Sequence, residues 1–246
     1  MKTEESLRRY FSRMGARVFV RGPGPRQRGR IRIDIGRDRT GEFFDIRSEE
    51  GVVPEILDVQ PSTRHLVLMV RDGGLKNKFL LGHDERHWFA AAVPGDNVRD
   101  VRTAIASLRP EEIEGREAIR QGEWFFVPEL GVSDKGAVIH RNEPLSRGAG
   151  SKPHICSEMM RRGGVTVMVS RQDPTGIDLT EYQKLIATNP DASGYLWRSM
   201  TRDAAVYARG EVRHKDHRTI DLCGWHRVYM NRERFARHAP QIAFLD

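Results

Sequence analysis

The sequence predicts an α+β fold of mostly antiparallel sheets packed with a few helices, and two patterns lead to this expectation. Short β-rich runs separated by turn residues fill the chain from about residue 16 to residue 93, whereas helical periodicity appears in only a few segments. The chain has 246 residues, of which 38% are hydrophobic. A chain of this length can bury about 70 to 75 per cent of its extended surface, so it needs neither a disulfide nor a metal to hold a core together.

The first expected element is a helix over residues 3–14. Thr3 can cap its start, and Gly15 can close its end. One face of this helix is apolar, because four hydrophobic residues fall at helical spacing: Leu7, Tyr10, Phe11 and Met14. We expect this face to pack on the sheet that follows.

The β-rich region contains runs with strand character: ARVFV, IRIDI, GEFFDI, EILDV, HLVLMV, KFLLG and HWFAAAV. In the second run, Ile31, Ile33 and Ile35 alternate with charged residues, which is typical of a strand with one face in solvent. We expect these runs to pair as antiparallel meanders.

A helical pattern over residues 98–108 ends before Pro110, and we place a domain boundary near residue 110. Residues 1–110 are expected to form an N-terminal helix plus an antiparallel β domain, and residues 111–246 a β-rich domain with two or three helices. The elements expected in the second domain are a strand at GEWFFVP, helices around 153–162 and 178–188, and a hairpin that joins VYARGEVRH to HRTIDLCGW through the two-residue turn Lys215-Asp216.

The excess of basic residues predicts a polyanionic partner. The chain has 41 Lys and Arg residues against 34 Asp and Glu residues, which gives a net charge of +7. A basic surface attracts nucleic acid through counterion release, and planar guanidinium groups suit phosphates. We therefore expect a nucleic-acid-binding protein that engages RNA or single strands in preference to reading duplex sequence.

Cellular location is predicted from two features of the sequence. No apolar run resembles a signal peptide or a membrane span, and Cys156 and Cys223 are the only cysteines. We expect a cytoplasmic protein without a membrane partner.

Two glycine-containing loops are candidates for phosphate binding. The loop at residues 22–30 combines Gly and Pro with arginines, and the segment EPLSRGAGSKPH at residues 143–154 precedes one of the expected helices. A helix start offers unpaired N–H groups and a positive dipole end to an anion, and Ser151 can cap it. The phosphate-binding candidates are Arg26, Arg28, Arg30, Arg147, Gly148, Gly150, Ser151 and Lys152. The second loop does not match the spacing of a Walker A motif.

The segment RHKDHRTIDLCGWH carries the candidates for catalysis. Its histidines and cysteine are numerous enough for a tetrahedral zinc site, but a strand register places Cys223 about 20 Å from the turn. We therefore assign no metal and expect no cofactor. Paired histidines can act as general acid and base while arginines stabilise a phosphorane. The catalytic candidates of such a nuclease are His214, His217, His226, Arg213 and Arg227.

Three classes of function remain open, and whether the chain is an enzyme is undecided. Nucleic-acid binding is favoured, and phosphodiester cleavage is the alternative. A structural subunit of a homo-oligomer or larger complex is the third class, since several strand aromatics have no assigned partner: Phe43, Phe44, Phe125 and Phe126. The four tryptophans are interpreted as core residues or as stacking platforms for bases.

The segments GEFFDI, KFLLGHDERHWFAAAVP, RQGEWFFVP, EPLSRGAGSKPH and HKDHRTIDLCGWHRVYMN resemble a family of uncharacterised bacterial proteins of similar length. The resemblance covers most of the chain. It implies a bacterial or phage origin and brings no activity, cofactor or site residue.

Overall fold

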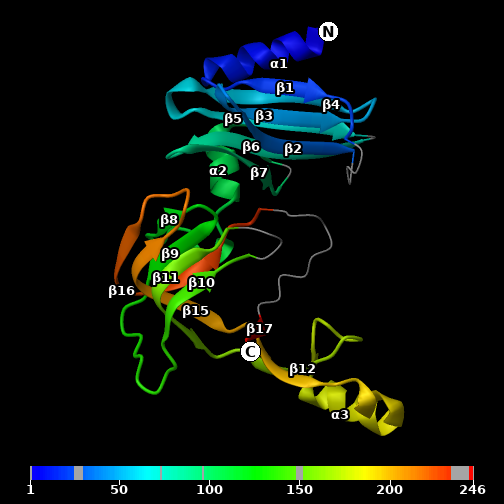
Figure 1. The fold of residues 1–246 in the computed structure, drawn as a ribbon, viewed down its shortest axis with the longest axis vertical. Helices are drawn as coiled ribbons and strands as arrows, with labels where there is room; N and C mark the ends of the chain where they lie inside the picture. Colours follow the sequence, from blue (N-terminus) through cyan, green and yellow to red (C-terminus); the bar gives the residue numbers. More distant parts are fainter. Residues whose placement is uncertain are drawn as a thin grey trace.

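The computed structural model describes residues 2–24, 30–72, 74–95, 97–147, 152–233 and 244–245. Within these ranges the chain is α+β, with three α-helices and mostly antiparallel sheets, as the sequence predicts. Figure 1 shows α1 at one end of the molecule, α2 between the two main β regions, and α3 with β12 at the other end.

The N-terminal part contains two sheets. In the first, β1 runs parallel to β3, and β3 pairs with β2 in antiparallel fashion. The second is an antiparallel meander in the order β4-β5-β6-β7. The elements are α1 (Lys2–Arg13), β1 (Val18–Arg21), β2 (Ile31–Asp38), β3 (Gly41–Ser48), β4 (Val53–Gln60), β5 (His65–Asp72), β6 (Leu75–Asp84) and β7 (His87–Val93).

The meander is covered on both faces because its central strands are apolar at consecutive positions. Leu66 and Leu68 of β5 pack in a core with Phe11 of α1 and Phe44 of β3. Val67, which points to the other face, packs in a second core with α2 (Val101–Ser107). Helix α2 begins with a capping box, since the side chain of Asp100 accepts a hydrogen bond from the backbone N–H of Thr103, and Oγ1 of Thr103 accepts one from the backbone N–H of Asp100.

The C-terminal part is built on a six-stranded antiparallel sheet in the order β10-β11-β15-β16-β9-β8. Its strands are β8 (Ile119–Gln121), β9 (Trp124–Pro128), β10 (His140–Leu145), β11 (His154–Arg162), β15 (Ala205–Arg213) and β16 (Ile220–Met230). The buried face of this sheet includes Phe126, Met159 and Leu222.

A small second sheet extends from the C-terminal part, in the order β13-β12-β14-β17. It carries the expected helix near residues 178–188. Its elements are β12 (Val165–Val169), β13 (Ile177–Asp178), α3 (Leu179–Thr188), β14 (Arg198–Arg202) and β17 (Phe244–Leu245). Short 3-10 helices occur at η1 (Pro61–Thr63), η2 (Glu111–Ile113) and η3 (Pro190–Gly194).

The prediction of a helix at residues 153–162 is wrong, because this segment forms strand β11. It pairs with β10 on one side and with β15 on the other, so almost its whole backbone is bonded across the sheet. Met and Arg are good helix formers, but burial of Cys156, Met159 and Met160 in the sheet overrides that local preference. No helix start exists there to bind an anion.

The hairpin of β15 and β16 is confirmed, but its two-residue turn is wrong. Strand β15 ends at Arg213 and β16 begins at Ile220, so six residues, 214–219, form the connection. Lys-Asp lacks the glycine that a two-residue turn favours, and the longer loop has the room to place two histidines together.

The strand aromatics that suggested an interaction surface have partners inside the chain. Phe44, Phe125 and Phe126 are buried, and Phe43 meets Phe19 edge-on with ring centroids 4.8 Å apart. Trp88, Trp124 and Trp225 are also at most 8% exposed, which leaves them unable to stack on bases. These residues stabilise the cores.

No sheet in the described ranges mixes strands from the two sides of residue 110, but the proposed domain division stays a prediction. Among the described residues, the helices are all too short or too polar to cross a membrane.

The two cysteines should differ in reactivity. Burial, with a smaller contribution from Glu143, raises the pKa of the Cys156 thiol to about 12, whereas Cys223 is exposed. We expect iodoacetamide at pH 8 to alkylate Cys223 alone in the folded protein and both thiols in denaturant, as read by peptide mass spectrometry. Equal alkylation of both in the folded protein would contradict the burial of β11.

Candidate functional site

A cavity of about 230 Å³ lies where the N-terminal and C-terminal parts meet. The turn between β6 and β7 contributes Asp84 and His87, and the loop at residues 214–219 contributes His214, Asp216 and His217. Both segments are hairpin connections, so each projects side chains beyond the end of its own sheet. Chemistry-bearing groups from two sheets therefore line one space.

Two of the lining residues, His214 and His217, form a cluster with the buried His154. Their ring nitrogens include one from each residue that lie within 4.8 Å of one another. The ring centroids of His154 and His214 are 4.2 Å apart, those of His214 and His217 are 4.6 Å apart, and those of His154 and His217 are 5.6 Å apart. The rings are stacked, with interplanar angles of 18° to 29°.

His154 is the most constrained of the three. It is the first residue of β11, where it pairs with Leu145 of β10, and it is 1% exposed. Within the described part of the chain, neither ring nitrogen has a hydrogen-bond partner. Burial, and then the neighbouring His214 and His217, lower the pKa of His154 to about 3. The ring is therefore neutral at physiological pH, with a lone pair that no donor of the described residues uses.

The lack of a side chain at Gly122 allows two of these rings to pack close to the backbone. A Cβ built on this residue would lie 2.9 Å from Nε2 of His217 and 3.3 Å from Nε2 of His154. The φ angle of Gly122 is +57°, a conformation that L side chains rarely adopt. Glycine is therefore favoured here for two reasons. It adopts the backbone conformation of the turn between β8 and β9, and it has no side chain to collide with the two rings.

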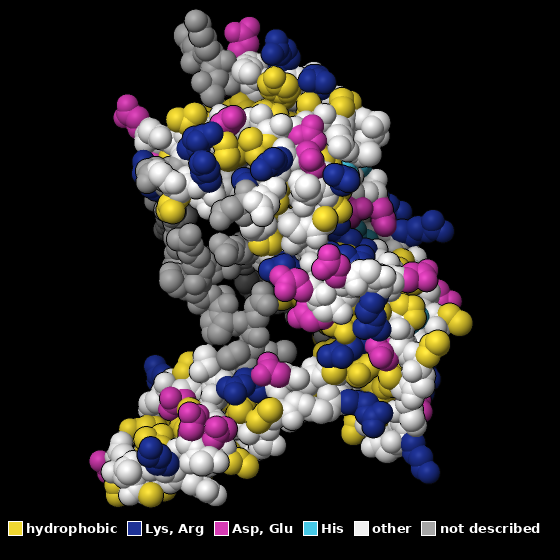
Figure 2. Space-filling model, turned by 180° about the vertical axis from the view of Figure 1, so that it is seen from behind, with side chains coloured by type: hydrophobic (Ala, Val, Ile, Leu, Met, Phe, Trp, Pro, Cys, Tyr) yellow, Lys and Arg dark blue, Asp and Glu magenta, His cyan; other side chains and the backbone are white. Residues whose placement is uncertain are grey.

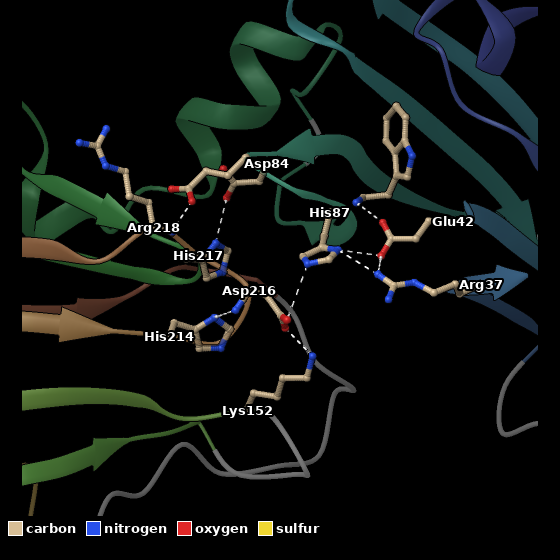
Figure 3. A network of polar contacts seen from close by, with 11 residues as sticks. Arg37, Glu42, Asp84, His87, Lys152, His214, Asp216, His217 and Arg218 are labelled. Atoms are coloured by element: carbon tan, nitrogen blue, oxygen red, sulfur yellow. Dashed lines mark hydrogen bonds and ion pairs between the residues drawn. The ribbon is translucent and has the colours of Figure 1, made fainter. Parts of the chain in front are cut away.

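Carboxylates of the β6–β7 turn hold the histidine loop. Nδ1 of His217 lies 3.9 Å from Oδ2 of Asp84, and the backbone N–H of Arg218 donates a hydrogen bond to Glu85. Figure 3 shows His217 directed toward Asp84. A carboxylate beside Nδ1 favours the tautomer that carries a proton there, which leaves Nε2 free to accept.

A second histidine–carboxylate pair adjoins the first. Nδ1 of His87 lies 2.7 Å from Glu42, and Nε2 of His87 lies 3.7 Å from Asp216 (Figure 3). Asp216 also accepts a hydrogen bond from Lys152. Burial opposes ionisation of Asp216, but the bond and charge of Lys152 outweigh it and lower the pKa of this carboxyl group. Burial likewise opposes ionisation of Glu42, but hydrogen bonds led by the Trp88 N–H lower its pKa.

Basic groups line the same cavity. Arg147 donates a hydrogen bond to Glu233 at 3.0 Å, and burial raises the pKa of that glutamate. The Nε of Arg120 donates to the carbonyl oxygen of Gly122 at 2.9 Å. The charges of Asp84, Glu233 and Glu123 act on Arg120, but among the described residues no hydrogen bond or ion pair to a carboxylate is formed by its terminal N–H groups.

The structure brings together only some of the residues that the sequence suggested for catalysis. His214 and His217 meet, but His226 lies in β16 opposite Ala208 and donates a hydrogen bond to Gly224. His226 is six residues along the strand from Ile220, or about 20 Å from the loop. It therefore cannot share a reaction with His214.

The two arginines proposed for catalysis also point elsewhere. Arg213 donates a hydrogen bond to Asn142 at 2.7 Å, and Arg227 stacks on the ring of Tyr229 at 5.1 Å. Neither side chain lines the cavity between the two parts.

The phosphate-binding candidates divide similarly. Arg147 and Lys152 reach the cluster, each paired with a carboxylate. Arg30 pairs with Glu49 at the opposite end of β2 from the cavity. Five candidates lie outside the described residues: Arg26, Arg28, Gly148, Gly150 and Ser151.

Many arginines of the described surface are paired with carboxylates. Examples outside the cavity are the pairs Arg17–Asp38, Arg71–Glu55 and Arg209–Glu158. On the face drawn in Figure 2, basic and acidic side chains are interspersed over both parts of the molecule. That face shows no continuous basic surface.

Sequence analysis missed His154, Gly122 and Asp84. His154 was assigned to a helix, and its partners lie about sixty residues away in the chain. Two motifs in the sequence, KPH and RHKDH, contain these three histidines, and both lie next to turn residues. Their similar position could have indicated that the three residues meet.

Comparison of the chain with protein-family models, with curated proteins and with solved structures finds no match. The candidate function therefore depends on the geometry of the site.

His154 should make the stability of the metal-free protein sensitive to acid. Its pKa is about 3 when folded and 6.5 in the reference state, so between these values the unfolded chain binds the extra proton. Stability from this group is present above pH 6.5 and is lost as the pH falls. We expect His154 to contribute about 2 kcal/mol to the loss in the free energy of unfolding between pH 8 and pH 5, measured by urea titration with chelator present.

His154→Gln removes the titrating group. Between pH 8 and pH 5, the unfolding free energy of this variant should therefore fall by about 2 kcal/mol less than that of the original protein, whatever the absolute stability of the variant. His140→Gln, on the partly exposed strand β10, is the matched control and should keep the slope of the original protein. If the unfolding free energies of His154→Gln and the original protein changed equally with pH, His154 would not be the source of the acid sensitivity.

Proposed function

We propose that the cavity between the two parts binds a phosphodiester group of nucleic acid and hydrolyses it. The observation that carries the proposal is the cluster of His154, His214 and His217, placed beside the carboxyl groups of Asp84 and Asp216 and near the guanidinium of Arg120. Such an arrangement contains proton-transfer groups and an anion-binding group in one enclosed space.

The imidazoles suit this reaction because they are held neutral. Burial, followed by the charge of His217, lowers the pKa of His214, and burial lowers that of His154. A neutral imidazole can accept the proton of an attacking water while a second group protonates the leaving alkoxide. The P–O bond to water forms as the P–O bond to the alkoxide breaks. Neutral imidazoles are also the form that ligates a metal, so the same cluster is compatible with either route to an activated water.

Arg120 is the best placed group to bind the phosphate. Its Nε is occupied by the Gly122 carbonyl oxygen, which orients the guanidinium and leaves the terminal N–H groups for substrate. The guanidinium also lies 5.5 Å from the ring centroid of Phe125, which restricts its motion. A planar fork fixed in this way can bind a phosphate through two N–H groups.

Binding of nucleic acid without cleavage is the second candidate, and the net charge of +7 favours it. The pairing of surface arginines argues that affinity comes from the cavity more than from a broad basic surface. For this candidate, as for the enzyme, the expected location is the cytoplasm, where RNA and single strands are present.

We expect the protein to cleave labelled single-stranded RNA or DNA at low salt, in a divalent-ion buffer or in chelator. His217→Ala should lower the cleavage rate by about 100-fold or more, since a proton-transfer group or a ligand is lost. Arg120→Gln should weaken binding of the same strands and reduce the dependence of log affinity on log salt by about one contact. Gel electrophoresis and filter binding measure the two effects.

The matched control is His140→Ala, whose side chain lies in a separate cavity near β10 and should leave both measurements unchanged. Salt-dependent binding with no cleavage under any condition would reject the enzyme and favour the binding protein. Absence of both binding and cleavage would reject the proposal altogether.

A further inference from the structure

We propose that His154, His214 and His217 bind one divalent transition-metal ion and leave a fourth coordination position open to the cavity. This inference goes beyond the proposed function, since it depends on the geometry of the cluster and does not require that nucleic acid be the substrate. It departs from the sequence analysis, which assigned no metal.

The separations within the cluster match a three-histidine site. With Zn–N distances of about 2.05 Å and tetrahedral angles, the ligating nitrogens are about 3.4 Å apart and the ring centroids about 5 Å apart. The centroids here are 4.2, 4.6 and 5.6 Å apart, and the nitrogens lie within 4.8 Å of one another. A movement of roughly one ångström by the nitrogens closes the site.

The buried nitrogens of His154 are the strongest reason to expect a ligand. Buried polar atoms in folded proteins almost always have a partner, and one that lacks a partner is destabilising. His154 is 1% exposed and has two such nitrogens, and Nδ1 of His217 is a third. A metal at Nε2 of His154 would satisfy a lone pair that no group of the described chain reaches.

Gly122 lets two of the ligating nitrogens come close together. A Cβ of residue 122 would lie only 2.9 Å from Nε2 of His217 and 3.3 Å from Nε2 of His154, so any side chain there would crowd both rings. Because the residue is glycine, both rings can approach the same point of the backbone.

Asp84 completes the arrangement as an outer carboxylate. Metal-ligating histidines commonly use their other nitrogen to contact a carboxylate, which fixes the tautomer and the ring orientation. Nδ1 of His217 faces Oδ2 of Asp84 at 3.9 Å, on the side away from Gly122. A small rotation of the ring shortens this contact to a hydrogen bond.

Binding requires the rings to turn out of their stacked arrangement, because near-parallel rings cannot all direct a nitrogen at one point. Two of the three residues can do this readily, since His214 and His217 belong to the loop at residues 214–219. Nδ1 of His214 accepts one hydrogen bond, from Asp216 N–H at 3.2 Å, which a metal bond can replace.

The ligand set selects the class of ion. Imidazole nitrogens suit Zn²⁺, Co²⁺, Ni²⁺ and Cu²⁺, whereas Mg²⁺ prefers oxygen ligands. Three protein ligands with an open fourth position are typical of catalytic zinc sites. The carboxylates and Arg120 around the open position would then contact the water or substrate bound there.

The test is metal binding by the full chain, stripped with chelator and dialysed. Calorimetric titration with Zn²⁺ should give one site per chain with micromolar or tighter affinity, and titration with Co²⁺ should give the visible absorption of four-coordinate cobalt. His217→Gln and His154→Gln should each weaken binding by about 100-fold or more, and Asp84→Asn by about 10- to 100-fold. His140→Gln is the matched control and should bind as the original protein does.

Circular dichroism establishes that each variant is folded, and His217→Gln is the decisive one because its residue is in a loop. The inference is overturned if the stripped protein binds neither ion, or if both histidine variants bind as tightly as the original protein. Cleavage of nucleic acid by a protein that binds neither ion would overturn this inference alone. Metal binding without cleavage would overturn the proposed enzyme alone.

Discussion

The contact between the β6–β7 turn and the loop at residues 214–219 determines the geometry of the candidate site. The Arg218 backbone N–H bonds to Glu85, and His217 and Asp216 face Asp84 and His87 across the same boundary. These interactions join two sheets that share no strand. If the two parts separated, the histidines would lose their carboxylates and the cavity would open to solvent.

Burial of His154 within β11 carries a cost that the rest of the sheet must offset. Strands on both sides pair with β11, while no group in the described ranges forms a hydrogen bond with the ring nitrogens of His154. A residue that opposes stability in this way is characteristic of a functional position, because sites are selected for chemistry at some expense of folding free energy.

Local patterns in the sequence were sufficient for most of the architecture. The apolar stripe of α1 and the alternation in β2 are short-range consequences of helical and strand periods, and both elements occur where they were expected. The local pattern gave the wrong prediction for residues 154–162. These residues favour a helix in isolation, but in the protein they pair with two flanking strands, and the Met and Cys side chains are buried. The net charge was equally uninformative about surface geometry, since it does not record which arginines meet a carboxylate.

By itself, then, the sequence determined the α+β class, the strands of the N-terminal meander and the β15–β16 hairpin, and it named His214 and His217 as candidates. Only the tertiary structure placed His154 beside these two residues, removed His226 from them and supplied Asp84 from the other part of the chain. The physical reason is the distance along the chain over which each kind of interaction acts. Periodicity and turn chemistry act over a few neighbouring residues, but the site is assembled from three segments up to 133 residues apart, whose approach is decided by how two sheets pack.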